Sequence, residues 1–110
     1  MHNDIFYALA DSTRRSILEM LAATNEMPAS EIHSKFKTSP QAISQHLKIL
    51  RETNLICMEK RAQQRIYRIN IDTLSQFEEW SKKVTQLWTN RLDAMEAVLK
   101  AEMAKGQKTD

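Results

Sequence analysis

The chain has 110 residues with sixteen Lys and Arg, fourteen Asp and Glu, and a formal net charge of +2. This length suits one domain over residues 1–110 and is too short for two independent cores. No apolar run approaches the roughly 18 to 20 residues of a membrane span, and the amino terminus lacks the features of a signal peptide. We therefore expect a cytoplasmic protein. The single cysteine excludes an internal disulfide and a multi-cysteine metal cage.

Two helices are predicted at the start of the chain, over residues 2–9 and 12–23. Asp11 is a good N-cap for the second helix because its carboxylate can accept a backbone N–H of the first turn. The first helix has apolar residues at Ile5, Phe6 and Leu9, and the second is expected to bury Ile17, Leu18 and Leu21 on one side.

Arg14 and Arg15 fall in the first turns of the second helix, where positive charge opposes the helix dipole. Two interpretations stay open at this stage. One or both arginines bind a phosphate, or they pair with acidic neighbours such as Asp11 or Glu19. We retain Arg15 as a candidate phosphate contact.

Residues 29–53 have the pattern of two helices around a tight turn. Lys37, Thr38 and Ser39 separate two apolar-periodic runs, and about three or four residues is the spacing of a helix-turn-helix. Ser39 can cap the second helix, and Pro40 fits its first position. Pro28 is expected in the first turn of the preceding helix, which lacks a polar cap. The apolar runs are Ala29, Ile32 and Phe36, then Ile43, Leu47 and Leu50.

The outward face of the second of these helices (residues 40–53) carries amides, hydroxyls and cations. Such side chains suit the recognition of base edges, because Gln can bond adenine and Lys can reach guanine acceptors. The alternative is an ordinary amphipathic helix with a solvated polar face. The outward residues are Gln41, Ser44, Gln45, Lys48 and Arg51.

A β-hairpin is predicted over residues 56–71. Asn54 can end the preceding helix in a left-handed conformation, and two β-like runs then meet across residues 62–64. Four cations, Lys60, Arg61, Arg65 and Arg68, are concentrated there. The pattern therefore indicates a wing whose cations can neutralise the phosphates of a nucleic acid. Gln64 and Arg65 are candidate contacts at its tip, whereas Arg61 and Arg68 have the alternative of facing water.

Excess positive charge is confined to the middle of the chain. Residues 37–68 contain seven cations and two anions, a net charge of +5, whereas the segments before and after it carry −2 and −1. A local basic patch on a nearly neutral chain favours a sequence-specific DNA-binding protein over one that coats polyanions without specificity. RNA is a further possibility on charge alone.

A long helix is predicted over residues 72–105, capped by Asp72 and ended by Gly106. Its two apolar lines cover more surface than a core of this size needs, so we expect a homodimer formed by this helix and residues 1–9. The alternative is that the helix wraps back on its own domain. The lines are Phe77, Trp80, Val84 and Leu87, and Trp88, Leu92, Met95 and Leu99.

Four runs are distinctive in combination, namely LADSTRRSILEML, SPQAISQHLKILRETNLI, RIYRIN and WTNRLDAMEAVL. Through them almost the whole chain resembles the ArsR (arsenical-resistance-type) family of bacterial transcriptional repressors. This resemblance implies a homodimeric winged helix-turn-helix repressor of element order α-α-α-α-β-β-α, in which the first and last helices form the dimer interface. By the same resemblance the recognition positions fall on Ser39, Gln41, Ser44, Gln45 and Lys48, with wing contacts around Gln64 and Arg65.

The metal-ligand motifs of that family are missing. The third helix region, EMPASEIHSKF, has no cysteine, and the last helix has no histidine. His2, His33, His46 and Cys57 are scattered, so we expect no metal and no cofactor. We expect His46 to be packed or to contact a phosphate, and Cys57 to be a small buried hydrophobe. Neither a Gly-rich phosphate loop nor a nucleophile beside a base is present, so the chain should not be an enzyme.

The sequence thus predicts a mainly helical protein with a small β-hairpin, a winged helix-turn-helix. We expect a homodimeric repressor that binds double-stranded DNA, with dimer contacts from Ile5, Phe6, Leu9, Trp88, Leu92, Met95 and Leu99. Three alternatives stay open: a winged-helix module that binds another protein instead of DNA, a metal- or redox-responsive repressor with an unrecognised site, and control by an unknown effector or protein partner.

Overall fold

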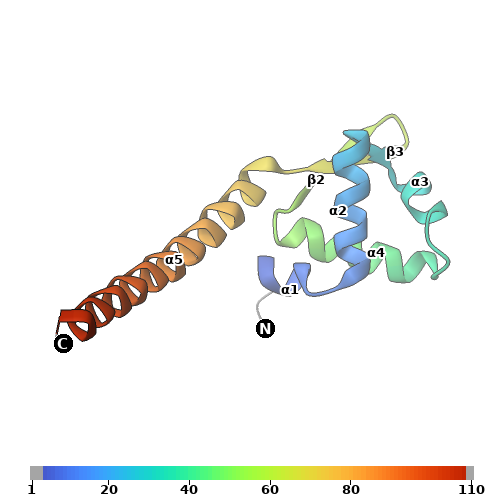
Figure 1. Cartoon of the computed structure of the whole chain (residues 1–110). Coiled ribbons are helices and arrows are strands. Elements are labelled where there is room, and N and C mark those ends of the chain that lie inside the picture. Colours follow the sequence, from blue (N-terminus) through green and yellow to red (C-terminus); the bar gives the residue numbers. More distant parts are fainter. Residues whose placement is uncertain (1–3, 109–110) are drawn as a thin grey trace. The chain divides into compact units, whose positions relative to one another are not determined.

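The structure is a computed structural model that describes residues 4–108. Its elements run in the order α1 (Ile5–Leu9), α2 (Ser12–Thr24), β1 (Met27–Pro28), α3 (Ala29–Ser34), α4 (Pro40–Glu52), β2 (Ile56–Arg61), β3 (Gln64–Ile69) and α5 (Ile71–Lys108) (Figure 1). The chain divides into two compact units, Met1–Ser75 and Gln76–Asp110. The assignment of residues 1–110 to one domain stays a prediction.

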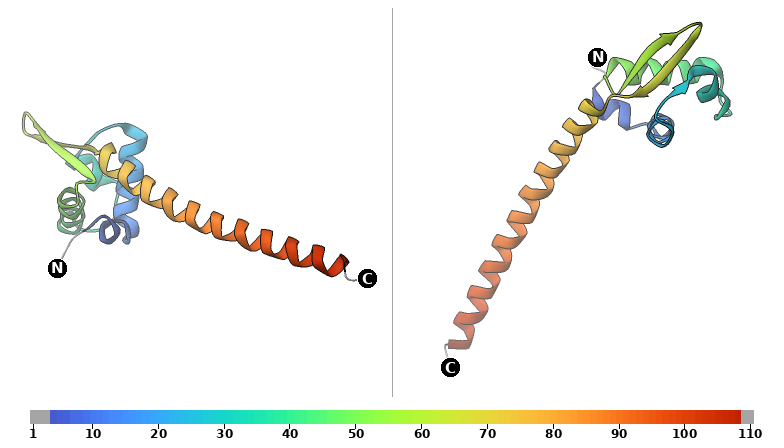
Figure 2. Two further views of the ribbon diagram at one scale, coloured as in Figure 1. Left: turned by 90° about the vertical axis from the view of Figure 1, so that its left-hand side faces the viewer. Right: turned by 90° about the horizontal axis from the view of Figure 1, so that it is seen from above.

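The first unit has the predicted winged helix-turn-helix plan, with α3 and α4 followed by the antiparallel hairpin β2–β3 (Figure 2). The sheet holds one strand more than predicted, because β1 pairs with β3 and gives the order β1-β3-β2. Two residues are too few to show an alternating pattern. Pro28 is tolerated in β1 because that strand lies at the edge of the sheet. Pro28 is also the N-cap of α3, one position before the predicted first turn, and makes no side-chain cap bond.

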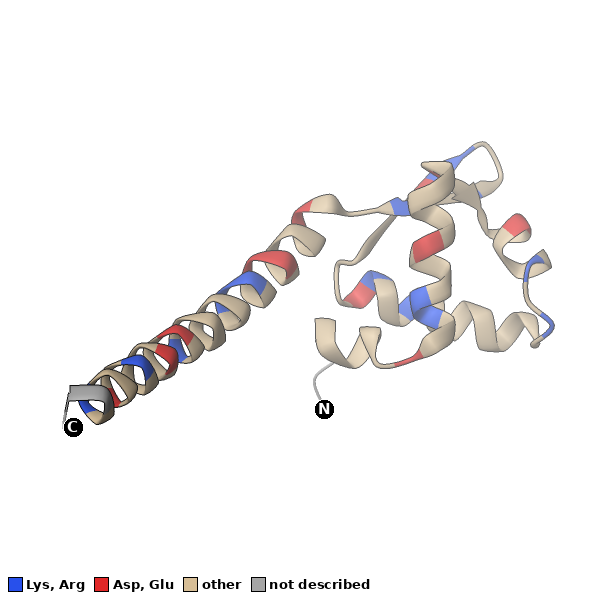
Figure 3. Ribbon diagram, viewed as in Figure 1, with Lys and Arg blue, Asp and Glu red and all other residues tan. Residues whose placement is uncertain are grey.

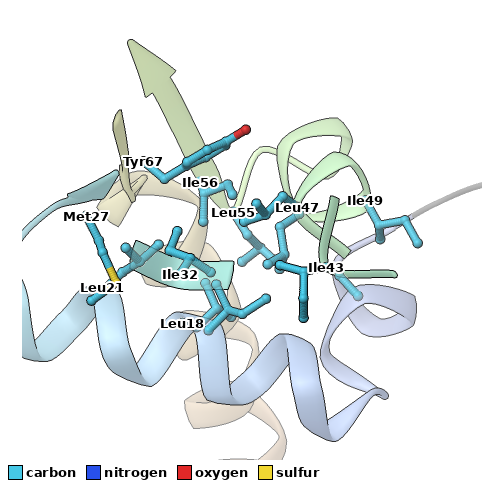
Figure 4. Close-up of a cluster of buried hydrophobic side chains, with 13 residues drawn as sticks. Leu18, Leu21, Met27, Ile32, Ile43, Leu47, Ile49, Leu55, Ile56 and Tyr67 are labelled. Carbon is cyan, nitrogen blue, oxygen red and sulfur yellow. The ribbon is translucent and has the colours of Figure 1, made fainter. Parts of the chain in front are cut away.

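The core of this unit lies between α2, α3, α4 and the sheet (Figure 4). The predicted inward residues of α2 and α4 are all buried, and Ile49 joins them. Ile5, Leu9, Ala29, Phe36 and Leu74 are partly buried against the same cluster. The largest fully buried side chains are Ile17, Leu21, Ile32, Ile43, Leu50 and Leu55.

The ends of α1 and α5 differ from the prediction. Helix α1 begins at Ile5, because the Asp4 carboxylate accepts the Tyr7 N–H at 2.8 Å and caps the helix there. The predicted start at His2 lies outside the described residues. Asp72 does not cap α5; its own N–H donates to the Asn70 side-chain oxygen at 3.2 Å.

Gly106 does not end α5, which continues to Lys108. A glycine ends a helix when it adopts a left-handed conformation, and Gly106 has no positive φ. Among the described residues no helix is long and apolar enough to cross a membrane.

The end of α4 is closed as predicted. Asn54 has a φ of 61°, which is the left-handed region, and its N–H donates to Arg51 O at 3.0 Å. The Leu55 N–H donates to Leu50 O at 2.9 Å, and both leucine side chains are fully buried. These bonds form a Schellman motif with its hydrophobic contact, which turns the chain from α4 directly into β2.

Substitution of Asn54 tests this turn. Asn54→Ala should lower the free energy of unfolding by about 1 kcal/mol, because alanine pays a steric penalty in the left-handed region. Asn54→Gly, which has no such penalty, should be neutral or slightly stabilising. Urea unfolding of both variants measures the difference, and equal stability of Ala and Gly would contradict the role of this backbone conformation.

Candidate nucleic-acid interface

The outward face of α4 presents four polar side chains that the rest of the protein does not use. Gln41, Ser44, Gln45 and Lys48 recur at intervals of three and four residues, so they share one helix face. All four are exposed, and within residues 4–108 none forms a hydrogen bond or ion pair. The face is therefore available to a ligand along two helical turns.

Ser39 fixes where this face begins. Its hydroxyl oxygen accepts the Ala42 N–H at 3.2 Å, and Pro40 occupies the first helical position, as predicted. The hydroxyl proton of Ser39 is still able to donate outward. Ser39 is thus a helix cap in the structure, and a contact from it to DNA stays a prediction.

Arg14 contacts α4 on the side opposite its exposed polar face. Its side chain is only 6% exposed. Nε donates to Ala8 O at 2.8 Å, one terminal nitrogen donates to Tyr7 O at 3.0 Å, and the other lies 3.1 Å from His46 Nδ1. The guanidinium of Arg14 thus binds the carbonyl end of α1, a partner that neither interpretation had named.

The surroundings of Arg14 complete this junction. His46 is half-buried and packed, one of the two outcomes expected for it, and its Nδ1 lies 3.8 Å from Asp11 Oδ2. Burial alone would raise the pKa of Asp11, but the Arg14 backbone N–H and the nearby charges of His46 and Arg14 lower it overall. Asp11 also caps α2 as predicted.

Arg15 differs from its neighbour in being exposed. One terminal nitrogen donates to Leu9 O at 2.6 Å, which leaves the remaining N–H groups of the guanidinium at the surface. The structure records no pairing of Arg15 with Asp11 or Glu19 within the described part of the chain. Its assignment as a phosphate contact stays a prediction.

The wing turns through a loop of two residues. Ala62 has a φ of 59°, and Arg61 pairs with Gln64 across the turn. Gln64 therefore opens β3 and does not belong to the loop, contrary to the prediction. A positive φ at the first loop position alone is the pattern of a type II′ turn, which matches the twist of the strands.

The cations of the wing are not equivalent, although Figure 3 shows Lys and Arg along the hairpin. Arg61 forms ion pairs of 2.6 Å with both Glu26 and Glu59. These carboxylates raise the pKa of Arg61, and the bond from Arg61 lowers that of Glu26. Arg61 is thus exposed but already paired with two carboxylates, and Gln64, Arg65 and Arg68 are exposed as well.

Cys57 and the histidines do not form a site. Cys57 is exposed on β2, so the prediction that it is buried was wrong. The strand alternates, and the buried Ile56 takes the inward position beside it. No three His, Cys, Asp or Glu side chains between residues 4 and 108 are grouped so that they could hold a metal ion.

Comparisons with known proteins agree with this geometry. The model of a helix-turn-helix domain family matches residues 9–58. The transcriptional repressor SdpR of Bacillus subtilis is 35% identical over 78 residues, which cover 71% of this chain and 86% of SdpR. The regulator Rv2034 of Mycobacterium tuberculosis is 30% identical over 95 residues, which cover 86% of this chain and 85% of Rv2034.

Among solved structures, an ArsR-like transcriptional regulator from Rhodococcus sp. RHA1 superposes with a TM-score of 0.78. The two sequences are 28% identical, and the match covers 88% of each chain.

Replacement of Arg14 tests the junction behind α4. Arg14→Met should lower the free energy of unfolding by about 3 kcal/mol, because two carbonyls and one imidazole lose a charged donor. Arg15→Met, which removes the neighbouring exposed arginine, should change it by less than about 1 kcal/mol. Urea unfolding gives both values, and equal losses would show that Arg14 has no special structural role.

Proposed function

The chain belongs to the ArsR family of helix-turn-helix transcriptional regulators and is a DNA-binding transcriptional regulator; from this premise we propose that it is a homodimeric repressor of a palindromic operator. The proposal rests above all on the exposed and unpaired face of α4. Two amides, a hydroxyl and an ammonium group match the donors and acceptors that bases present in the major groove.

We assign base contacts to Gln41, Ser44, Gln45 and Lys48 and backbone contacts to the other exposed candidates. Glutamine can bond adenine with both ends of its amide, and lysine can donate to guanine. Ser39 at the start of α4, Arg15 on α2 and Gln64 and Arg65 on β3 then contact phosphates or sugars, which fix the register on the duplex. Ser39 and Arg15 keep donors beyond those used inside the protein.

The second unit supports a dimer. Described alone, it is a single helix, and Trp88, Leu92, Met95 and Leu99 are between 45% and 60% exposed. One helix cannot bury these side chains against itself, and Met and aromatic residues are enriched at interface cores. A twofold partner is the commonest assembly that covers such a face. Phe6 is 48% exposed and can extend the interface, together with the partly buried Ile5 and Leu9.

Repression follows from the same geometry. A dimer with two recognition helices covers two half-sites about 10 base pairs apart or a multiple of that distance. Such a complex blocks access to the DNA beneath it. The relative SdpR is named as a transcriptional repressor, and we propose a cytoplasmic location because the protein acts on DNA. The proposed assembly requires no catalytic step.

The α4 assignment is tested by Gln45→Ala and Lys48→Ala. Each should weaken binding to a duplex selected from a random pool by about tenfold and reduce discrimination at one position, because each removes a base contact. Gln86→Ala on α5 is the control and should bind as the wild type does. Fluorescence anisotropy at fixed salt measures all three, and unchanged affinity in both α4 variants would refute DNA recognition by this helix.

The dimer is tested by Leu92→Glu. A buried carboxylate without a partner is costly at an interface, so this variant should sediment as a monomer at a concentration where the wild type is a dimer. Asn90→Glu adds the same charge about 200° away around α5 and should stay dimeric. If Leu92→Glu keeps the mass of the wild type, α5 is not the interface.

A further inference from the structure

A hollow of about 400 Å³ lies in the first unit between α3, α4 and β3. Leu47 and Tyr67 are its large apolar lining residues. Its polar lining is His33, Ser44, Lys48, Arg51 and Arg65, and it includes no carboxylate. Three cations from two elements thus surround one space without an acidic neighbour in its wall.

These cations have no partner in the protein. The side chains of Lys48, Arg51 and Arg65 form no ion pair or hydrogen bond within residues 4–108. Other cations do find carboxylates: Arg61 binds two of them, and Lys82 binds Glu78 at 2.9 Å. The charge in the hollow is therefore not balanced from within, as it would be in an ordinary surface ion-pair network.

The hairpin register adds a second, independent observation. Lys60 lies directly opposite Arg65 on the neighbouring strand. Like charges at such positions destabilise a sheet, and both side chains are exposed. The next pair outward, Arg61 with Gln64, has no such conflict, since Arg61 has its two carboxylates. The repulsion between Lys60 and Arg65 does not stabilise the fold, but a bound anion beside Arg65 would reduce this repulsion.

We infer that this hollow is a binding site for a phosphate group. Arg51 and Arg65 supply the bonds, because each planar guanidinium group can donate two bonds to phosphate oxygens, and the ammonium group of Lys48, which is assigned to a base, adds positive charge beside them. His33 supplies a further donor, because an imidazole carries at least one N–H. Arg51 and His33 thereby gain a role that the base-reading assignment did not give them.

Two sources can supply this phosphate. In the complex with DNA it is a phosphodiester of the backbone beside the bases that α4 contacts, and this identity rests on the proposed function. In the absence of DNA it is a free phosphate or phosphate monoester. Because both occupy the same space, a free phosphate in the hollow competes with the duplex, which is a chemically simple way to release an operator.

The site is tested first without DNA. Inorganic phosphate is titrated into the full-length protein at constant ionic strength, with chloride as the balancing anion, and the arginine side-chain NMR signals are followed. The wild type should show saturable binding. Arg51→Gln and Arg65→Gln should each weaken it about tenfold, the effect expected for one charge-assisted bond.

Arg68→Gln is the matched control, because Arg68 is an exposed arginine of β3 that does not line the hollow. It should bind phosphate as the wild type does. Unsaturable shifts, or equal affinity in all four proteins, would overturn the phosphate site even if duplex binding is intact.

The second measurement identifies the source. The logarithm of duplex affinity is measured against the logarithm of salt concentration, with and without phosphate at equal ionic strength. If the DNA backbone occupies the hollow, Arg51→Gln makes this negative slope shallower by about one. Added phosphate then also weakens the binding of the duplex to the wild type. An unchanged slope with intact phosphate binding assigns the site to free phosphate. If the wild type binds an unrelated duplex as tightly as the selected one, the proposed function is refuted, but saturable phosphate binding would still support the phosphate site.

Discussion

The buried guanidinium of Arg14 joins three helices at one point. It belongs to α2, bonds two carbonyls at the end of α1 and lies 3.1 Å from His46 on α4. A charged donor buried to this degree is stable only when its hydrogen bonds are satisfied, so the three elements are held in one arrangement. Helix α4 is therefore fixed through contacts on its inner side, and the polar side chains on its outer side form no contacts that the fold requires.

The division between structure and recognition continues in the charges. Cations that serve the fold have their partners, as Arg14 has carbonyls and Arg61 has Glu26 and Glu59. Lys48, Arg51 and Arg65 have none in the described chain, and they are gathered on the surface formed by α4 and β3. A net charge of only +2 therefore conceals a local concentration of positive charge, which attracts polyanions.

Several features with a local cause could be predicted from the sequence, although the ends of α5 could not. The Ser39 cap, the left-handed Asn54 and the inward residues of α4 depend on neighbours within a few positions, and each was predicted correctly. Strand β1 and the Arg14 junction depend on contacts far apart in the chain. The only local hint of that junction was an arginine at a helix start, where the dipole disfavours it. The burial of Cys57 was predicted wrongly because its neighbours Ile56 and Met58 are also apolar. Three apolar residues in a row do not reveal which side chains of the strand point inward.

Selection of bound duplexes from a random DNA library by the full-length protein tests most directly whether two copies of α4 bind one symmetric site. We expect the enriched sequences to contain two inverted copies of one short half-site, with centres about 10 base pairs or a multiple apart. A single unrepeated site would contradict the dimeric mode of reading. Failure to enrich any sequence at moderate salt would contradict sequence-specific binding itself.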